Sequence, residues 1–77
     1  MTNKEVGRVI LGDTEYRAKI FDSKNLFGRI RWACRIDKKP IHAISWTHKD
    51  TISKIKNEEQ AVLTAKKELE RLENLNN

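Results

Sequence analysis

The strongest constraint on the fold is a stretch of alternating apolar and basic side chains at positions 28–37. Its apolar members are Ile30, Trp32, Cys34 and Ile36. The residues between them are Arg29, Arg31, Ala33 and Arg35. Because successive side chains of a strand point to opposite faces, this period of two predicts a strand with one buried and one solvated face. We therefore expect the apolar side to anchor a small sheet on a helix, and the arginine side to be the working surface.

The length of the chain restricts it to a single domain. A chain of 77 residues can bury only a small hydrophobic core, so we expect one domain over positions 1–77. No apolar run is long enough for a signal peptide or a membrane span, and Val9–Leu11 is typical of those present. The single cysteine, Cys34, cannot form an internal disulfide, and an unstapled domain of this kind suits a reducing cytosol. We therefore expect a cytoplasmic protein that does not bind membranes.

Charge is distributed unevenly along the chain, whose formal net charge is +5. Positions 1–56 hold thirteen Lys and Arg against six Asp and Glu, whereas five glutamates crowd the segment that follows. Such an excess favours a polyanionic partner, which could be DNA, RNA or an acidic protein surface. The alternative explanation is that the charge serves only solubility.

Alternation and turn residues together predict an antiparallel meander. The expected strands lie at about 6–11, 15–22, 28–37 and 41–46. Gly12 and Asp13 supply the first turn, and Asp37 to Pro40 form another tight turn, since proline cannot donate to a central ladder.

Three segments of the chain are open to more than one assignment. In the stretch 41–46 either face can be the buried one, although the bulk of Ile44 and Trp46 favours burying those two. The stretch 47–56 is compatible with a loop or a short helical turn. Between the second and third strands, we expect Leu26 and Phe27 to cap one edge of the core, in preference to forming an exposed apolar tip.

The clearest element is a helix at about 57–74. Asn57 and Gln60 have the spacing of a capping box. The apolar positions that follow recur every three or four residues, and their stripe contains Ala61, Val62, Ala65, Leu69 and Leu72. The predicted fold is therefore α+β, with an antiparallel three- or four-stranded meander packed against one C-terminal helix.

The sequence lacks the motifs of enzymatic chemistry. Its three glycines are too scattered to hold a phosphate, and neither Cys-x-x-Cys nor His-Glu-x-x-His occurs. His42, His48 and Asp50 match no metal-ligand spacing, and Cys34 lies on the expected core face. We expect a non-enzymatic protein with no metal and no cofactor.

The basic side of the predicted sheet is the best candidate for a binding surface. Arginine can bridge a phosphate bidentately and read guanine edges, and the major groove admits a β surface. Trp32 shares its face with apolar residues, so we assign it to the core. The candidate nucleic-acid contacts are Arg17, Lys19, Arg29, Arg31, Arg35, Lys38 and Lys39.

The stretch 28–72 resembles a known type of DNA-binding domain in the order of its elements. The pattern runs from Gly28–Trp32 through Ile41–Trp46 to an acidic helix start at Asn57–Glu59. It is similar to the amino-terminal arm-binding domain of conjugative-transposon and phage integrases, and more distantly to the plant ethylene-response domain. The resemblance implies a three-stranded sheet, backed by a helix, that enters the major groove. The predicted hairpin at 6–21 has no counterpart in that pattern.

If the resemblance holds, it implies roles for particular residues. Arg29, Arg31 and Arg35 would face DNA, and Lys38 and Lys39 would contact its backbone. The leading hypothesis is therefore a module that binds double-stranded DNA, with RNA as a further possible ligand.

The alternative is a small inhibitor or adaptor, of the type encoded by phages and mobile elements, that docks on an acidic surface of a host protein. Its apolar anchors would be Leu26, Phe27 and Trp46. A homodimer is compatible with either hypothesis.

Overall fold

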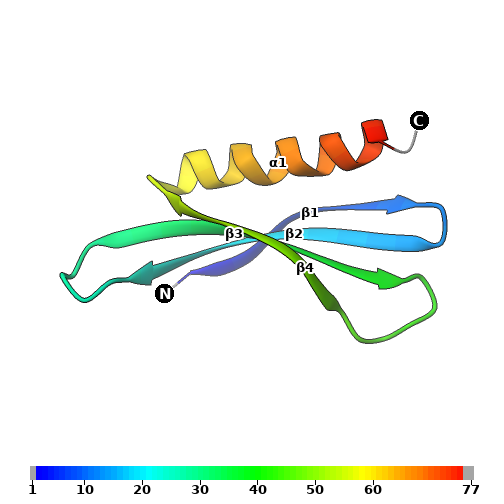
Figure 1. Cartoon of the computed structure of the whole chain (residues 1–77), viewed down its shortest axis with the longest axis horizontal. Coiled ribbons are helices and arrows are strands. Elements are labelled where there is room, and N and C mark those ends of the chain that lie inside the picture. The colour runs from blue at the N-terminus through cyan, green and yellow to red at the C-terminus, as the bar shows by residue number, and fades with distance from the viewer. Residues whose placement is uncertain (1, 76–77) are drawn as a thin grey trace.

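Four antiparallel strands and one helix make up the fold (Figure 1). The computed structural model describes residues 2–75. The elements are β1 (Asn3–Leu11), β2 (Thr14–Lys24), β3 (Ile30–Pro40), β4 (Thr47–Ile55) and α1 (Glu58–Leu75). The strands follow one another in the order β1-β2-β3-β4, and α1 lies across one face of the sheet. The predicted α+β architecture, a meander packed against one C-terminal helix, is confirmed.

The core lies between α1 and the two central strands. Ala18 and Ile20 of β2 pair with Ile36 and Cys34 of β3, and all four side chains are buried on the helix side. Ala61, Ala65, Leu69 and Leu72 of α1 are buried against them. The apolar face predicted for β3 and the helical stripe therefore meet, as expected. The small side chains on both surfaces allow the helix to approach the strands closely.

Helix α1 begins where its capping residues predict. The Asn57 side-chain oxygen accepts a hydrogen bond from the backbone N–H of Gln60 at 2.9 Å. Glu58 and Glu59 occupy the first turn, where the helix dipole favours negative charge. Within residues 2–75, no helix has both the length and the apolar character needed to cross a membrane.

The fourth strand is not where alternation predicted it. Positions 41–46 form a loop, β3 continues to Pro40, and the strand is Thr47–Ile55. In this loop Ile44 is 95% exposed, so the expectation that it is buried was wrong.

A β-bulge in β4 explains the error. Cys34 pairs with Ile52 and Trp32 with Ile55, so β4 holds one more residue than β3 between these pairs. The extra residue lets Ile52 and Ile55, which strict alternation would place on opposite faces, both pack against the core. Lys54 in the bulge has a φ of 62°, in the left-handed region.

The β2–β3 turn also differs from the prediction. Leu26 and Phe27 do not cap the core but lie at the apex of the hairpin, exposed to 100% and 89%. The reason is visible in Figure 1, where β2 and β3 extend past the start of α1, so that their turn projects at one end of the molecule.

Close packing at Gly7 yields a stability prediction. A Cβ at this position would lie 3.1 Å from Cδ1 of Leu69, closer than ordinary van der Waals contact, so a larger side chain requires the buried Leu69 side chain to shift. We expect Gly7→Val to lower the free energy of unfolding by about 2 kcal/mol, because overpacking forces neighbours to shift. Denaturant unfolding of Gly7→Val, Leu69→Ala and the double variant measures the energetic coupling between these two positions. The double variant should lose less than the sum of the two single losses, and strict additivity would contradict this packing.

Candidate nucleic-acid interface

The face of the sheet opposite α1 is called the bare face here. The strand register places on it the side chains that alternate with the buried ones. Its charged members are Glu5, Arg8, Glu15, Arg17, Lys19, Arg31, Arg35, Asp37 and Lys39. Cations from three strands therefore share one surface. The sequence predicted this arrangement for β2 and β3 only, and Arg29, assigned to the third strand, lies in the turn before β3.

Asp37 anchors the middle of the bare face. Its side chain is nearly inaccessible, with 1% of the residue exposed. Nε of Arg17 donates to one carboxylate oxygen at 3.0 Å and Nε of Arg35 to the other at 2.7 Å. Burial raises the pKa of Asp37, but the hydrogen bonds and charges of Arg35 and Arg17 outweigh it, so the pKa lies below its usual value. The sequence predicted a turn at Asp37, whereas this residue belongs to a central strand.

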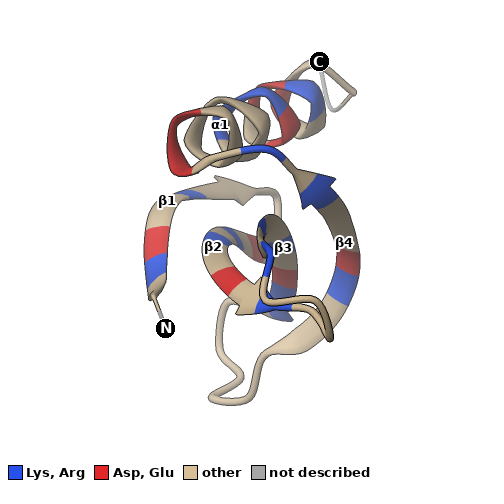
Figure 2. Ribbon diagram, turned by 90° about the vertical axis from the view of Figure 1, so that its left-hand side faces the viewer, with Lys and Arg blue, Asp and Glu red and all other residues tan. Residues whose placement is uncertain are grey.

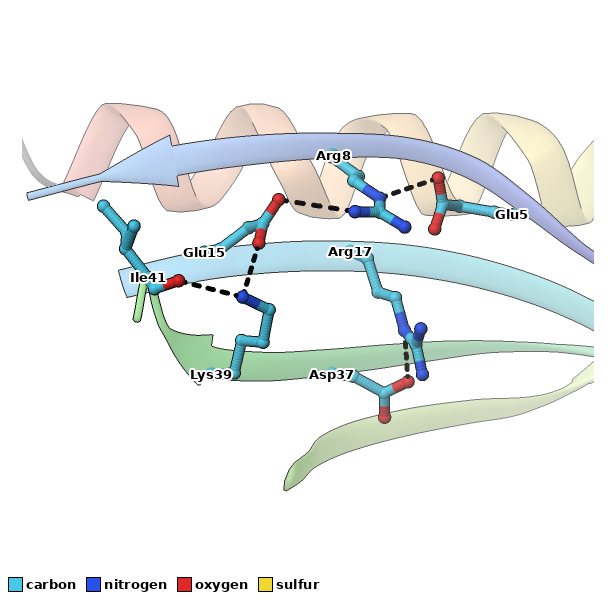
Figure 3. A network of polar contacts seen from close by, with 7 residues as sticks. All are labelled: Glu5, Arg8, Glu15, Arg17, Asp37, Lys39 and Ile41. Carbon is cyan, nitrogen blue, oxygen red and sulfur yellow. Dashed lines mark hydrogen bonds and ion pairs between the residues drawn. The ribbon is translucent and has the colours of Figure 1, made fainter. Parts of the chain in front are cut away.

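A second set of ion pairs crosses β1, β2 and β3 (Figure 3). Arg8 contacts Glu5 at 2.9 Å and Glu15 at 3.5 Å, and Nζ of Lys39 contacts the other oxygen of Glu15 at 3.0 Å. The hydrogen bond from Lys39, followed by the charges of Lys39 and Arg8, lowers the pKa of Glu15 despite its partial burial. Lys39 is therefore held within the sheet, and not at the hairpin tip where the sequence placed it.

Trp46 lies against the same cations. Cζ of Arg17 is 4.2 Å from the ring centroid, and Nζ of Lys39 and Cζ of Arg8 are 5.3 and 5.4 Å from it. These are cation–π distances. The β3–β4 loop therefore returns across the bare face and covers part of it with a half-buried indole. Trp46 is neither a strand residue of the helix-side core nor a free apolar anchor.

A separate group of cations surrounds the β2–β3 turn and is called the tip cluster. Its members are Lys24, Arg29, Arg31, Lys54 and Lys56, all exposed. Among the described residues, none of the five has an acidic side chain within ion-pair distance. Arg31, Lys54 and Lys56 line a shallow hollow together with Asn25. Figure 2 looks onto this end, with basic segments at the end of β4 and before α1.

The sequence-predicted contacts thus divide into three groups. Arg17, Lys19 and Arg35 line a hollow in the middle of the bare face. Arg29 and Arg31 belong to the tip cluster. Lys38 is opposite Tyr16 on the helix side of the sheet, whereas Lys39 lies on the bare face with the first group, paired with Glu15.

Sequence reasoning missed three members of the tip cluster. Lys54 and Lys56 were missed because they belong to β4 and the segment after it, a region with no assigned structure in the sequence. Lys24 was missed because it lies at the end of β2, beyond the predicted strand. For Lys54 and Lys56, the sequence offered one clue, the high density of lysines at positions 49–56.

Two further potentially reactive side chains, those of His48 and Cys34, are held by a local contact or by burial. Within the part of the chain that the structure describes, no group of three His, Cys, Asp or Glu side chains could hold a metal ion. His48 contacts the Thr51 hydroxyl at 2.6 Å, which satisfies one ring nitrogen locally. Cys34 is fully buried in the core.

Asp37 should control part of the acid sensitivity. A depressed native pKa contributes stability at pH values above the unfolded value near 3.8, and that stability is lost as pH falls through the native pKa. At pH 7, Asp37→Asn should lower the free energy of unfolding by about 2 kcal/mol, because two charge-assisted hydrogen bonds are weakened. The deficit should shrink below about pH 4, measured by denaturant unfolding across pH. Asp13→Asn at the exposed β1–β2 turn is the control, and a deficit independent of pH would contradict the assignment.

The Cys34 thiol should be unreactive in the native state. Burial, helped by the nearby charges of Glu68 and Asp50, raises its pKa to about 11, and the thiolate is the reactive form. Labelling with an aromatic disulfide reagent near pH 8 should therefore proceed no faster than unfolding, and should be immediate in concentrated guanidinium. Rapid labelling of the native protein would show that the thiol is accessible.

The chain was also compared with known proteins. No protein-family model, no curated protein and no solved structure matches it. The proposed function therefore rests on the charges and geometry of the bare face and the tip cluster.

Proposed function

We propose that the protein is a non-enzymatic DNA-binding module that holds double-stranded DNA against the bare face, with the tip cluster as its principal phosphate contact. The observation that carries this proposal is the tip cluster itself. It gathers exposed cations from β2, β3 and β4, and it has no acidic partner among the described residues. Unpaired cations at one end of a sheet face that no helix covers suit a polyanion, since phosphate contacts supply a large share of the affinity for DNA.

The middle of the bare face can add to this contact. Arg35 uses Nε to bind Asp37, while its side chain remains 47% exposed, which leaves donors for a phosphate oxygen. Lys19 is opposite Arg35 in the neighbouring strand. The ion pairs to Asp37 orient the guanidinium groups before any ligand arrives, and this lowers the entropy cost of binding.

The opposite end of the bare face is less suited to an anion. There Glu15 contacts both Arg8 and Lys39, and Trp46 covers the cations. Glu5 is opposite Lys19 in the strand register, and its carboxylate is paired with Arg8. We therefore place the DNA along the half of the bare face that leads from Arg35 and Lys19 to the tip cluster. The proposed location of this module is the cytoplasm, where a free thiol such as that of Cys34 persists.

A second candidate function is docking on an acidic surface of a host protein. The exposure of Leu26 and Phe27 favours it, because interfaces depend on a few apolar anchors. Trp46, the third anchor suggested by the sequence, is engaged with three cations and contributes less. This candidate requires no affinity for duplex DNA, which separates it from the first.

The test is binding of a random-sequence duplex, followed by fluorescence anisotropy across a salt series. Affinity should fall steeply with salt, because each neutralised phosphate releases counterions. The double variant Arg29→Glu with Arg31→Glu should reduce affinity roughly tenfold or more. It should also lower the slope of log affinity against log salt concentration by the equivalent of about two phosphate contacts.

The matched control is Lys66→Glu with Lys67→Glu, which makes the same charge change on the exposed side of α1. This variant should retain most of the affinity. Arg35→Glu is avoided, because it would set a second carboxylate beside the buried Asp37. Absence of duplex binding at low salt, or equal losses in the two double variants, would refute the proposal; in the first case docking on a protein becomes the better hypothesis.

A further inference from the structure

The apex of the β2–β3 hairpin exposes two large apolar side chains side by side. Leu26 and Phe27 are exposed to 100% and 89%, and they lie at one end of the longest axis of the molecule (Figure 1). A small monomer gains nothing in stability from such a pair, and exposed apolar patches mark interaction sites. Neither the phosphate contacts nor the core explains why these two residues are apolar.

The turn that carries them is well defined by hydrogen bonds. The Asn25 side-chain oxygen accepts from the backbone N–H groups of Phe27 and Arg29, both at 2.9 Å. The backbone of Asn25 pairs with that of Arg29 and of Gly28, and Gly28 adopts a φ of 77° that closes the turn. The apolar pair is therefore presented by a closed turn at the end of a long hairpin.

The surroundings of the apolar pair indicate the kind of partner. The tip cluster flanks it, so the partner must offer negative charge around an apolar interior. A DNA duplex has this character, because its stacked bases lie between two rows of phosphates. An anionic membrane also has it, but a membrane would meet only the tip, whereas two further cations, Arg35 and Lys19, lie on the bare face beyond the uncharged pair of Phe21 and Ala33. Their position favours DNA.

We propose that the hairpin tip is a wedge that inserts Phe27, with Leu26 beside it, between neighbouring base pairs of the bound duplex and kinks it. This inference rests on the proposed function, since it assumes that the bare face holds DNA. Apolar side chains that enter a base step from the minor groove unstack it and bend the duplex by roughly 20–90°. The flanking cations would then hold the phosphates on both sides of the kink.

The dimensions of the protein allow both contacts at once. From Lys19 to Lys24, β2 covers five residue steps, roughly 17 Å at about 3.3 Å per residue, which is about half of a 34 Å helical turn of DNA. The tip can therefore reach a groove other than the one that faces the middle of the sheet.

The experiment measures energy transfer between dyes at the two ends of a duplex of about 30 base pairs, with the full chain at low salt. The wild-type protein should shorten the distance between the duplex ends and raise the transfer. Phe27→Ser should abolish most of this increase, lower the affinity less than about tenfold and leave the salt dependence of binding unchanged, because the phosphate contacts remain. Ile44→Ser is the matched control, because Ile44 is equally exposed in the β3–β4 loop at the other end of the sheet, and it should bend DNA like the wild type.

The outcomes separate the wedge from the proposed function. Binding without any rise in transfer, or an equal rise with Phe27→Ser, would overturn the wedge and leave the DNA-binding proposal standing. No binding to the duplex would overturn the proposed function itself. Vesicles of phosphatidylserine are the comparison ligand. If they bind the protein through Phe27 while the duplex does not, the tip belongs to a membrane contact and both proposals fail.

Discussion

Burial of the Asp37 carboxylate determines where the arginines in the middle of the bare face are held. An isolated carboxylate on a central strand would be costly to bury, so the fold depends on Arg17 and Arg35, which approach it from β2 and from β3 itself. Trp46 then lies over Arg17 and brings the β3–β4 loop across the sheet. One buried charge thus explains why two arginines are fixed in place, and the Trp46 indole on Arg17 lets a loop cover part of the bare face without a second helix.

The sequence predicted the fold wherever a single period described a segment. Alternation identified the core side of β3, and the three- and four-residue spacing identified the buried stripe of α1, because both elements are half buried and regular. The fourth strand could not be found in this way. Its bulge at Lys54 lets Ile52 and Ile55 share a face, although residues three apart lie on opposite faces of a regular strand. The loop 41–46, by contrast, alternates by chance.

The candidate site was predictable only in part, for a related reason. A strand pattern shows which side chains share a face, so alternation alone was enough to group Arg17, Lys19 and Arg35. It does not show which of them meet an acid from another strand, and Arg17 lies twenty positions away from Asp37 in the chain. The approach of Lys54 and Lys56 to Arg31 depends on the pairing of β4 with β3, which the sequence did not reveal.

The two ends of the bare face therefore carry the same type of charge under different physical conditions. Near Glu15, at the end by the β1–β2 turn, Arg8 and Lys39 are both within ion-pair distance of an acid. In the tip cluster five exposed cations share one end of the sheet, and no described acid lies within ion-pair distance of them. Under the proposed function, this excess of one sign of charge contributes to binding, whereas a surface that served only solubility would be expected to mix both signs.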